Sequence, residues 1–249
     1  MIVGRPLIRL TETGSTMDLA SRLADAGATS GTTVLAGHQT AGRGRAGRVW
    51  TTAPDTSILM SFVAHTRRPR HELGALSLLL GLAVSQTVDH RTGATSAIKW
   101  PNDVLVGGRK IAGILVLSKA LHHRDVLCLI AGIGLNVYDP SSQLPDTATS
   151  ITTMAATPPS FDVVLSTLLR NLTVVVDRFE TGDTGELWRE IGDRLAYRGE
   201  MVRLEDGPRT CEGIMKGVSR AGLLELQLPS GEIISVAAGD LTRGPVVRG

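Results

Sequence analysis

A segment rich in glycine and arginine is the first place where this sequence could do chemistry. Gly42-Arg43-Gly44-Arg45-Ala46-Gly47-Arg48 carries three guanidinium groups within six residues. Arginine forks bind phosphate oxygens, and backbone N–H groups of a glycine-rich loop can do the same. Without an anion the three charges repel one another, so we expect a loop that stays mobile until a ligand binds. The segment predicts a phosphate cradle; the alternative is a solvated surface loop or a nucleic-acid contact.

The glycine spacing in this segment also matches the dinucleotide-binding pattern G-x-G-x-x-G. That pattern requires a strand running into the glycines and a helix directly after them. Residues 49–54, which follow here, are typical of a strand or a turn. No G-x-x-x-x-G-K-[ST] sequence occurs, so the sequence argues against both a Rossmann site and a P-loop.

A second candidate region contains lysines and amides. Only four of the 26 basic residues are lysine, and two of them fall at Lys99 and Lys110. Lys110 leads into an apolar strand, where it would be partly desolvated beside a carboxylate or phosphate, and Gly113 permits close approach of a ligand. The alternative is that Lys110 merely caps a hairpin. Asn136 ends another apolar strand, and the alternative there is an ordinary turn asparagine.

Known catalytic signatures are missing from the sequence. It has no H-E-x-x-H spacing and no G-x-S-x-G nucleophile elbow. Cys128 and Cys211 match no metal-binding or redox spacing, and Cys128 lies in an apolar run typical of a core. Arginines, lysines and amides without a nucleophile suit chemistry driven by charge neutralisation and positioning, such as nucleotidyl transfer.

Composition sets the class of protein. The chain has 249 residues, a formal charge of +2, 42% hydrophobic residues and 3% aromatic residues. This is the composition of a globular protein with one large domain, or one domain and a small appendage. The apolar runs are too short to cross a membrane, and the N-terminus lacks the features of a signal peptide. We therefore expect a reduced, cytoplasmic protein with no membrane association.

The hydrophobic pattern predicts elements that would hold these groups in place. Strands are expected at 7–10, 32–36, 56–63, 97–100, 104–106, 110–117 and 126–136, and helices at 15–26, 73–88, 161–179 and 185–197. Ser15 and Asp18 have the spacing of a capping box, and Gly107-Gly108 is a natural hairpin turn. Residues 144–160 are expected to be irregular. After residue 199, four short alternating segments (201–204, 213–218, 223–228 and 233–237) predict a small β-barrel. The predicted domains are 1–198 and 199–249.

Taken in order, these motifs resemble the biotin–protein ligases. The matching segments are Gly14-Ser15-Thr16, Gln39-Thr40-Ala41-Gly42-Arg43-Gly44-Arg45-Ala46-Gly47-Arg48-Val49-Trp50, Lys99-Trp100-Pro101-Asn102-Asp103, Arg109-Lys110-Ile111-Ala112-Gly113-Ile114-Leu115 and Gly132-Ile133-Gly134-Leu135-Asn136. The resemblance spans about residues 8 to 240. It implies an α+β fold in which a mixed sheet with packed helices, like that of class II synthetases, precedes an SH3-like barrel.

The resemblance also implies a reaction of two steps. The carboxylate of biotin attacks the α-phosphate of MgATP and forms biotinyl-5′-AMP and pyrophosphate. A lysine of a biotin carboxyl carrier domain, expected to belong to a biotin-dependent carboxylase, then attacks the mixed anhydride and releases AMP. Monomer and homodimer both remain open.

Site residues follow from the resemblance by position. The implied catalytic residues are Lys110, Arg45 and Arg48. The implied biotin-binding residues are Ser15, Thr16, Met17, Gln39, Gly42, Arg43, Gly44, Arg45, Trp50, Lys110, Gly113 and Ile114. The implied ATP- or adenylate-binding residues are Arg43, Arg45, Arg48, Lys99, Asn102, Asp103, Lys110 and Asn136. The sequence does not identify metal ligands.

Three positions depart from the family pattern, and two other functions remain open. Met17 stands where the family often has asparagine, Ala46 where it often has a basic residue, and Leu117 where it often has an acid. About fourteen residues precede Ser15, too few for the DNA-binding domain that some members carry, so we expect no DNA binding by that route. A lipoate–protein ligase is the nearest alternative function. A non-enzymatic nucleic-acid binder is the other, although scarce aromatics and the small net charge disfavour it.

Overall fold

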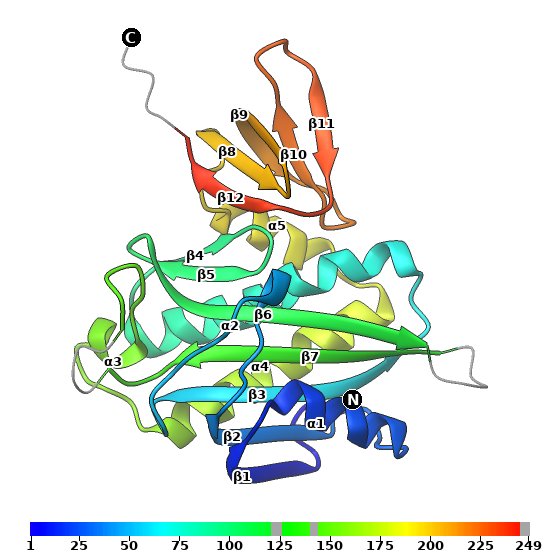
Figure 1. Ribbon diagram of the computed structural model, residues 1–249, viewed down its shortest axis with the longest axis vertical. Helices are drawn as coiled ribbons and strands as arrows, with labels where there is room; N and C mark the ends of the chain where they lie inside the picture. Colours follow the sequence, from blue (N-terminus) through cyan, green and yellow to red (C-terminus); the bar gives the residue numbers. More distant parts are fainter. Residues whose placement is uncertain (121–125, 140–143, 245–249) are drawn as a thin grey trace.

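The computed structural model describes residues 1–120, 126–139 and 144–244 and contains two β-sheets (Figure 1). The first is a seven-stranded mixed sheet of order β1-β2-β3-β7-β6-β5-β4, in which β1 and β2 are parallel and the other pairs antiparallel. The second is a five-stranded antiparallel sheet of order β11-β10-β9-β8-β12. It lies beyond β4 and β5, at the top of the view.

The strands of the first sheet match the predicted apolar segments to within a few residues at their ends, and Trp100 lies in the turn after β4 rather than in the strand. They are β1 (Leu7–Thr13), β2 (Thr33–Gln39), β3 (Ser57–Thr66), β4 (Ser96–Lys99), β5 (Asp103–Val106), β6 (Arg109–Ala120) and β7 (Leu127–Asn136). β1 and β2 are longer than predicted because the two strands continue to pair with each other as far as Thr13 and Gln39. That pairing brings Gln39 to the end of β2, beside Thr13. The Gly107-Gly108 hairpin is confirmed between β5 and β6.

Helices cover both faces of this sheet. They are α1 (Thr16–Asp25), α2 (Leu76–Thr92), α3 (Ile151–Met154), α4 (Phe161–Thr181) and α5 (Gly185–Arg194), with short 3-10 helices at Arg45–Gly47 and Arg70–Ala75. The main core packs α2 and α4 against alternate residues of β3, such as Ile58, Met60 and Phe62. A smaller core packs Met17 and other residues of α1 against the opposite face. Within the described parts of the chain, no helix is both long and apolar enough to span a membrane.

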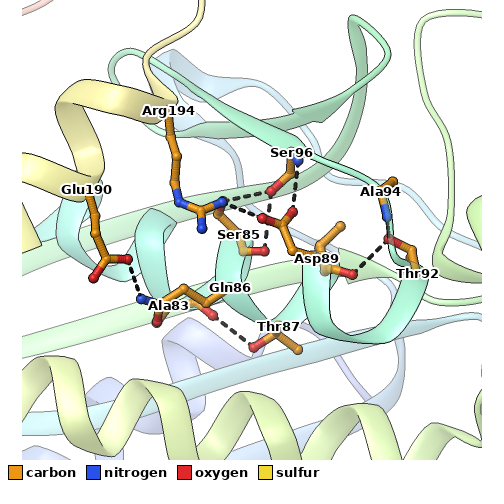
Figure 2. Close-up of polar contacts among 11 residues, drawn as sticks. Ala83, Ser85, Gln86, Thr87, Asp89, Thr92, Ala94, Ser96, Glu190 and Arg194 are labelled. Carbon is orange, nitrogen blue, oxygen red and sulfur yellow. Dashed lines mark hydrogen bonds and ion pairs between the residues drawn. The ribbon is translucent and has the colours of Figure 1, made fainter.

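A half-buried polar network fixes β4 to the helices behind it (Figure 2). Arg194 of α5 forms an ion pair with Asp89 of α2, and each side chain is 24% exposed. Asp89 Oδ1 also accepts the backbone N–H of Ser96 at 2.8 Å, and the hydroxyls of Ser85 and Ser96 lie 2.7 Å apart. Because Ser96 begins β4, these bonds set the position of the strand that ends at Lys99.

The second sheet is small and antiparallel, which is consistent with the expected SH3-like barrel. Its strands are β8 (Met201–Asp206), β9 (Arg209–Val218), β10 (Leu224–Gln227), β11 (Ile233–Val236) and β12 (Asp240–Arg243). β12 was not predicted from the sequence. The sheet joins the first part of the chain through Trp100, whose indole N–H donates to the Gly222 carbonyl at 3.0 Å. Gly222 has a φ of +82°, and its backbone packs too closely on Gly74 to leave room for a side chain.

Candidate functional site

A cavity of about 250 Å³ lies where α1, β3, β6, β7, the 42–50 loop, the 99–103 turn and β12 meet. Most of the residues singled out from the sequence line it: Thr16, Met17, Gln39, Arg43, Gly44, Arg45, Arg48, Trp50, Lys99, Asn102, Asp103, Lys110, Gly113 and Ile114. They come from four separate stretches of the chain. The tertiary structure therefore brings together motifs that are far apart in the sequence.

One end of the cavity is neutral and polar. Gln39 Oε1 accepts the backbone N–H of Thr16 at 2.7 Å and the Thr16 hydroxyl at 3.0 Å. Thr16 Oγ1 also lies 2.8 Å from Ser61 Oγ, and both residues are buried. Hydroxyl and amide groups held in this way suit a small ligand with several hydrogen-bonding atoms and no charge.

Ser15 lies beside this end with its hydroxyl unused. It is the N-cap residue of α1, with an extended backbone, but its side chain caps no helix N–H. Ser15 Oγ is buried and has no hydrogen-bond partner among the described residues. The predicted capping box is therefore wrong in its bonds: Ser15 Oγ accepts no helix N–H, and the Asp18 carboxylate pairs with Arg43. A buried donor without a partner is expensive unless a ligand completes it.

A glycine surface supports Trp50 across the middle of the cavity. A Cβ at Gly134 of β7 would lie 2.5 Å from Trp50 Cε2, and one at Gly113 of β6 would lie 2.9 Å from Trp50 Cζ3. Only glycine at both positions lets the indole lie flat on the sheet. Trp50 Nε1 is buried without a partner in the described chain, so it too is available to a ligand.

Lys110 marks the other, charged end. Its Nζ lies 2.7 Å from Asp103 Oδ1 and 5.2 Å from the centre of the Trp50 ring. The two charged side chains are 35% and 18% exposed, as expected for a partly desolvated lysine. The backbone of Lys110 is held on both sides, by Thr147 at 2.8 Å and Thr149 at 2.9 Å. This ammonium group can therefore bind a carboxylate or phosphate at a fixed place.

The arginine loop forms a hairpin over the cavity. Gly44 N–H donates to Arg48 O at 2.7 Å, and Trp50 N–H donates to Gly42 O at 3.1 Å. Gly42 is required because a Cβ there would overlap the Trp50 carbonyl. Of the sequence alternatives, a loop wholly solvated at the surface is wrong, since Arg43, Gly44, Arg45 and Arg48 line the cavity.

Each arginine of this loop has an oxygen partner. The expectation of a mobile loop considered only the repulsion among the three positive charges. Arg43 pairs with Asp18 at 2.6 Å, and Arg48 pairs with Asp240 at 2.6 Å. Arg45 donates to Asn102 Oδ1 at 3.2 Å. These acceptors offset part of the mutual repulsion of the three guanidinium groups.

Arg45 is the most desolvated of the three guanidiniums. Burial lowers its pKa from the ordinary value, and nearby Arg48 adds to this effect, while Asp240 and Asp103 oppose it. Arginine stays charged in proteins, so the lowered pKa reflects a cation that has lost part of its hydration.

Three of the expected site residues do not line the cavity. Ser15 precedes α1 beside the polar end, and Gly42 packs on the backbone of Trp50. Asn136 ends β7, where it accepts from Ser57 Oγ at 3.3 Å and donates to the Thr149 carbonyl at 3.1 Å. It lines a neighbouring hollow that also touches Trp50 and Lys110, so these two side chains separate the two spaces.

Sequence reasoning missed several residues of the site. Asp18 was assigned to a helix cap, and Asp240 belongs to the strand that was not predicted. Ser61 did leave a signal, because it is the one polar residue in the run Ile-Leu-Met-Ser-Phe-Val-Ala. Gly132 and Gly134 were part of a quoted motif but were not assigned to the site.

The fold and the cavity define an α+β protein whose candidate ligand site has neutral hydrogen-bonding groups at one end and cationic groups at the other. Residues 7–136 match the model of the biotin/lipoate A/B protein ligase family, and residues 198–241 match that of the biotin protein ligase C-terminal domain. The chain belongs to the biotin/lipoate A/B protein ligase family.

Individual proteins agree with this assignment. Biotin–[acetyl-CoA-carboxylase] ligase of Mycobacterium tuberculosis is 34% identical over 95% of this chain and 88% of its own length. The bifunctional ligase/repressor BirA of Bacillus spizizenii is 40% identical over 61% of this chain, and the match spans about half (46%) of that relative's length. The structure of the biotin protein ligase of Aquifex aeolicus in complex with biotin and ATP is similar with a TM-score of 0.79 and 30% identity, covering 96% of this chain and 99% of the other.

Proposed function

We propose that this chain is an ATP-dependent biotin–protein ligase. It joins biotin to AMP using MgATP and then transfers the biotinyl group to a lysine of a carrier protein. The observation that carries the proposal is the cavity itself, with a neutral hydrogen-bonding end and a cationic end on either side of Trp50. Biotin has the same division, with a cyclic urea at one end and a carboxylate at the other. The similarity to a ligase bound to biotin and ATP supports the same assignment.

Biotin would lie along the cavity from Thr16 to Lys110. The urea would meet Thr16, Gln39 and the unused hydroxyl of Ser15, which together offer donors and acceptors to a neutral group. Its apolar part would contact Trp50 over the glycine surface. Met17, Gly44, Gly113 and Ile114 would form the remaining wall, and Gly42 would hold the loop against Trp50. This direction leaves the carboxylate at the ammonium group of Lys110.

The first step brings two anions together, so its barrier is mainly electrostatic. A carboxylate oxygen attacks the α-phosphorus, the bond from that phosphorus to the bridging oxygen breaks, and pyrophosphate leaves with the electron pair. Lys110 would exchange its Asp103 contact for the reacting carboxylate and α-phosphate. Arg45 and Arg48 would neutralise the charge that moves onto pyrophosphate.

The nucleotide would occupy the cationic end and the hollow beyond it. Arg43, Lys99, Asn102 and Asp103 line the cavity, and the phosphates would lie against them. Asn136 lies in the hollow next to Trp50 and Lys110, within reach of the nucleoside. Mg²⁺ would arrive with ATP as part of the substrate.

The second step transfers biotin to a partner. The amine of a carrier lysine attacks the carbonyl carbon of the mixed anhydride and forms an amide. The bond from that carbon to the phosphate oxygen breaks, AMP leaves with the electron pair, and the amine loses a proton. We infer a biotin carboxyl carrier domain of a biotin-dependent carboxylase as the acceptor, a cytoplasmic location, and a monomer or homodimer. We also retain the division of the chain into domains 1–198 and 199–249 as a proposal.

Exchange of labelled pyrophosphate into ATP tests the function directly. The protein should catalyse this exchange with biotin present and not with lipoate, which distinguishes the two activities within the family. The named biotin-ligase relatives do not favour the lipoate activity. Mass spectrometry should then show one biotinyl group added to a carrier domain incubated with protein, biotin and ATP. Absence of biotin-dependent exchange would overturn the proposal.

A further inference from the structure

Ser61 is a buried hydroxyl in the middle of an otherwise apolar strand. It lies on β3, opposite Gly132 of β7, and it is fully buried yet lines the cavity. Its neighbours on the same face of β3, Leu59 and Val63, are apolar. Burying a hydroxyl there is unfavourable unless it makes a hydrogen bond, and its partner is Thr16 Oγ1 at 2.8 Å.

The direction of that hydrogen bond follows from its neighbours. The atom of Gln39 that lies 2.7 Å from the Thr16 backbone N–H must be an acceptor, which fixes it as Oε1. The same oxygen also lies 3.0 Å from Thr16 Oγ1, so the Thr16 hydroxyl donates its only proton to Gln39. Ser61 must therefore donate its own proton to Thr16.

The series of hydrogen bonds from Ser61 through Thr16 orients the side-chain amide of Gln39. With Oε1 held by two donors of Thr16, the amino group Nε2 has no protein acceptor among the described residues and remains free for a ligand. Were the Ser61 proton absent, the Thr16 hydroxyl would lose its donor and could rotate away from Gln39. The amide would then keep only the backbone N–H of Thr16.

Met17 makes this arrangement more important in this chain. It occupies the position where an amide is common in the family, and its sulfur lies against Gly132, where any Cβ would overlap it. The same Cβ would lie 3.4 Å from Ser61 Oγ, so Met17 and Ser61 lie side by side over Gly132. The thioether of Met17 adds no amide to the polar end of the cavity, so Gln39 must supply more of the binding.

We propose that Ser61 is a positioning residue for ligand recognition: through Thr16 it directs the Gln39 amide so that Nε2 is presented to the carbonyl of the biotin urea. This inference rests on the proposed function. The competing explanation is a purely structural role, in which Ser61 only satisfies Thr16.

A double-mutant cycle measured by calorimetric titration with biotin separates the two roles. Ser61→Ala should weaken biotin binding about tenfold, the scale of losing one well-placed hydrogen bond, and leave the KM for ATP unchanged. In a Thr16→Val background, Ser61→Ala should have no further effect, because the connection to Gln39 is already cut. Thr33→Val is the matched control. It removes an equally buried strand hydroxyl, bonded to Gly31 O and Gly4 N at 2.9 Å, outside the cavity.

The outcomes are distinct. Parental biotin affinity in Ser61→Ala would overturn the inference, as would an equal loss of affinity in the parental and Thr16→Val backgrounds. A fall in melting temperature similar to that of Thr33→Val, with affinity unchanged, would establish the structural role instead. If Ser61→Ala does not fold, Ser61→Cys, which keeps a weak donor, should show an intermediate affinity. Failure of the parental protein to bind biotin would overturn the proposed function and this inference with it.

Discussion

Arg48 Nη2 lies 2.6 Å from Asp240 Oδ1, although the two residues are 192 positions apart. This ion pair joins the arginine loop of the first part of the chain to β12 of the second sheet. Arg45 reaches the same strand end, since it donates to the Gly239 carbonyl at 3.5 Å. The C-terminal sheet therefore forms one wall of the cavity and holds the loop that lies over it.

Asp240→Asn should loosen the arginine loop in the free protein. Arg48 would lose its carboxylate, and trypsin should cleave after Arg48 faster than in the parent. The two side chains are 59% and 49% exposed, so the free energy of unfolding should change by no more than about 1 kcal/mol. Asp162→Asn, which removes the exposed pair with Arg9, is the control. Parental cleavage rates in Asp240→Asn would mean that this pair does not restrain the loop.

Ligands should protect the same loop from trypsin. Phosphate oxygens can replace Asp18, Asn102 and Asp240 as partners of the three arginines and hold the loop closed over the mixed anhydride. We expect cleavage after Arg43, Arg45 and Arg48 in the free protein and strong protection with biotin and ATP. Cleavage after the exposed Arg67 should not change, which serves as the internal control. Equal cleavage with and without ligands would contradict closure of the loop.

Lys110→Met should lower the rate of adenylate formation by about 10² or more, the scale of losing one placed charge. It also leaves Asp103 without its cation beside the cavity. Lys119→Met is a matched control from the same strand. Lys119 Nζ lies 2.6 Å from Asp25 Oδ1, and Lys119 does not line the cavity. Labelled pyrophosphate exchange measures both variants. An unchanged rate in Lys110→Met would show that the ammonium group has no part in the reaction.

Trp50→Ala should weaken biotin binding about tenfold or more while changing the melting temperature little. The indole lies on Gly113 and Gly134 at the cavity wall, so its loss removes ligand contact more than core packing. Trp188→Ala is the aromatic control, since Trp188 packs against the main core. It should lower the melting temperature and leave biotin affinity unchanged. The opposite pattern in Trp50→Ala would assign this residue to the core alone.

Glu180 should make the free energy of unfolding depend on pH. Burial raises the pKa of its carboxyl, while the Thr66 hydroxyl and Arg68 oppose the shift, and Oε1 is buried without a partner in the described chain. A raised folded pKa means that the folded state holds this proton more tightly, so stability falls as pH rises from the ordinary glutamate pKa through the folded pKa. Glu180→Gln should flatten this fall and raise the melting temperature near pH 7. A steeper decline in the variant would contradict the assignment.

Local pattern was enough to predict most elements and most of the cavity residues. Apolar runs and alternating segments marked the seven strands of the first sheet, because each is half or fully buried by packing against its neighbours. β12 escaped prediction because Asp240–Arg243 is a four-residue edge strand whose polar residues show no alternation; it forms only by pairing with β8. The capping box was predicted from spacing, but the Asp18 carboxylate pairs with Arg43 and the Ser15 hydroxyl caps no helix N–H.

The sequence by itself determined which residue types are present for the chemistry: the arginine loop, Lys110, Gln39, Trp50 and the glycines that leave room for them. Only the tertiary structure decided their partners. Asp18 with Arg43, Thr16 with Ser61 and Arg48 with Asp240 are separated by 25, 45 and 192 residues. Periodicity reports which face of an element is buried, whereas a hydrogen bond between distant residues depends on strand register and on how helices and sheets dock. Those relationships arise from packing of the whole chain, and they are what turn the separate motifs into one cavity.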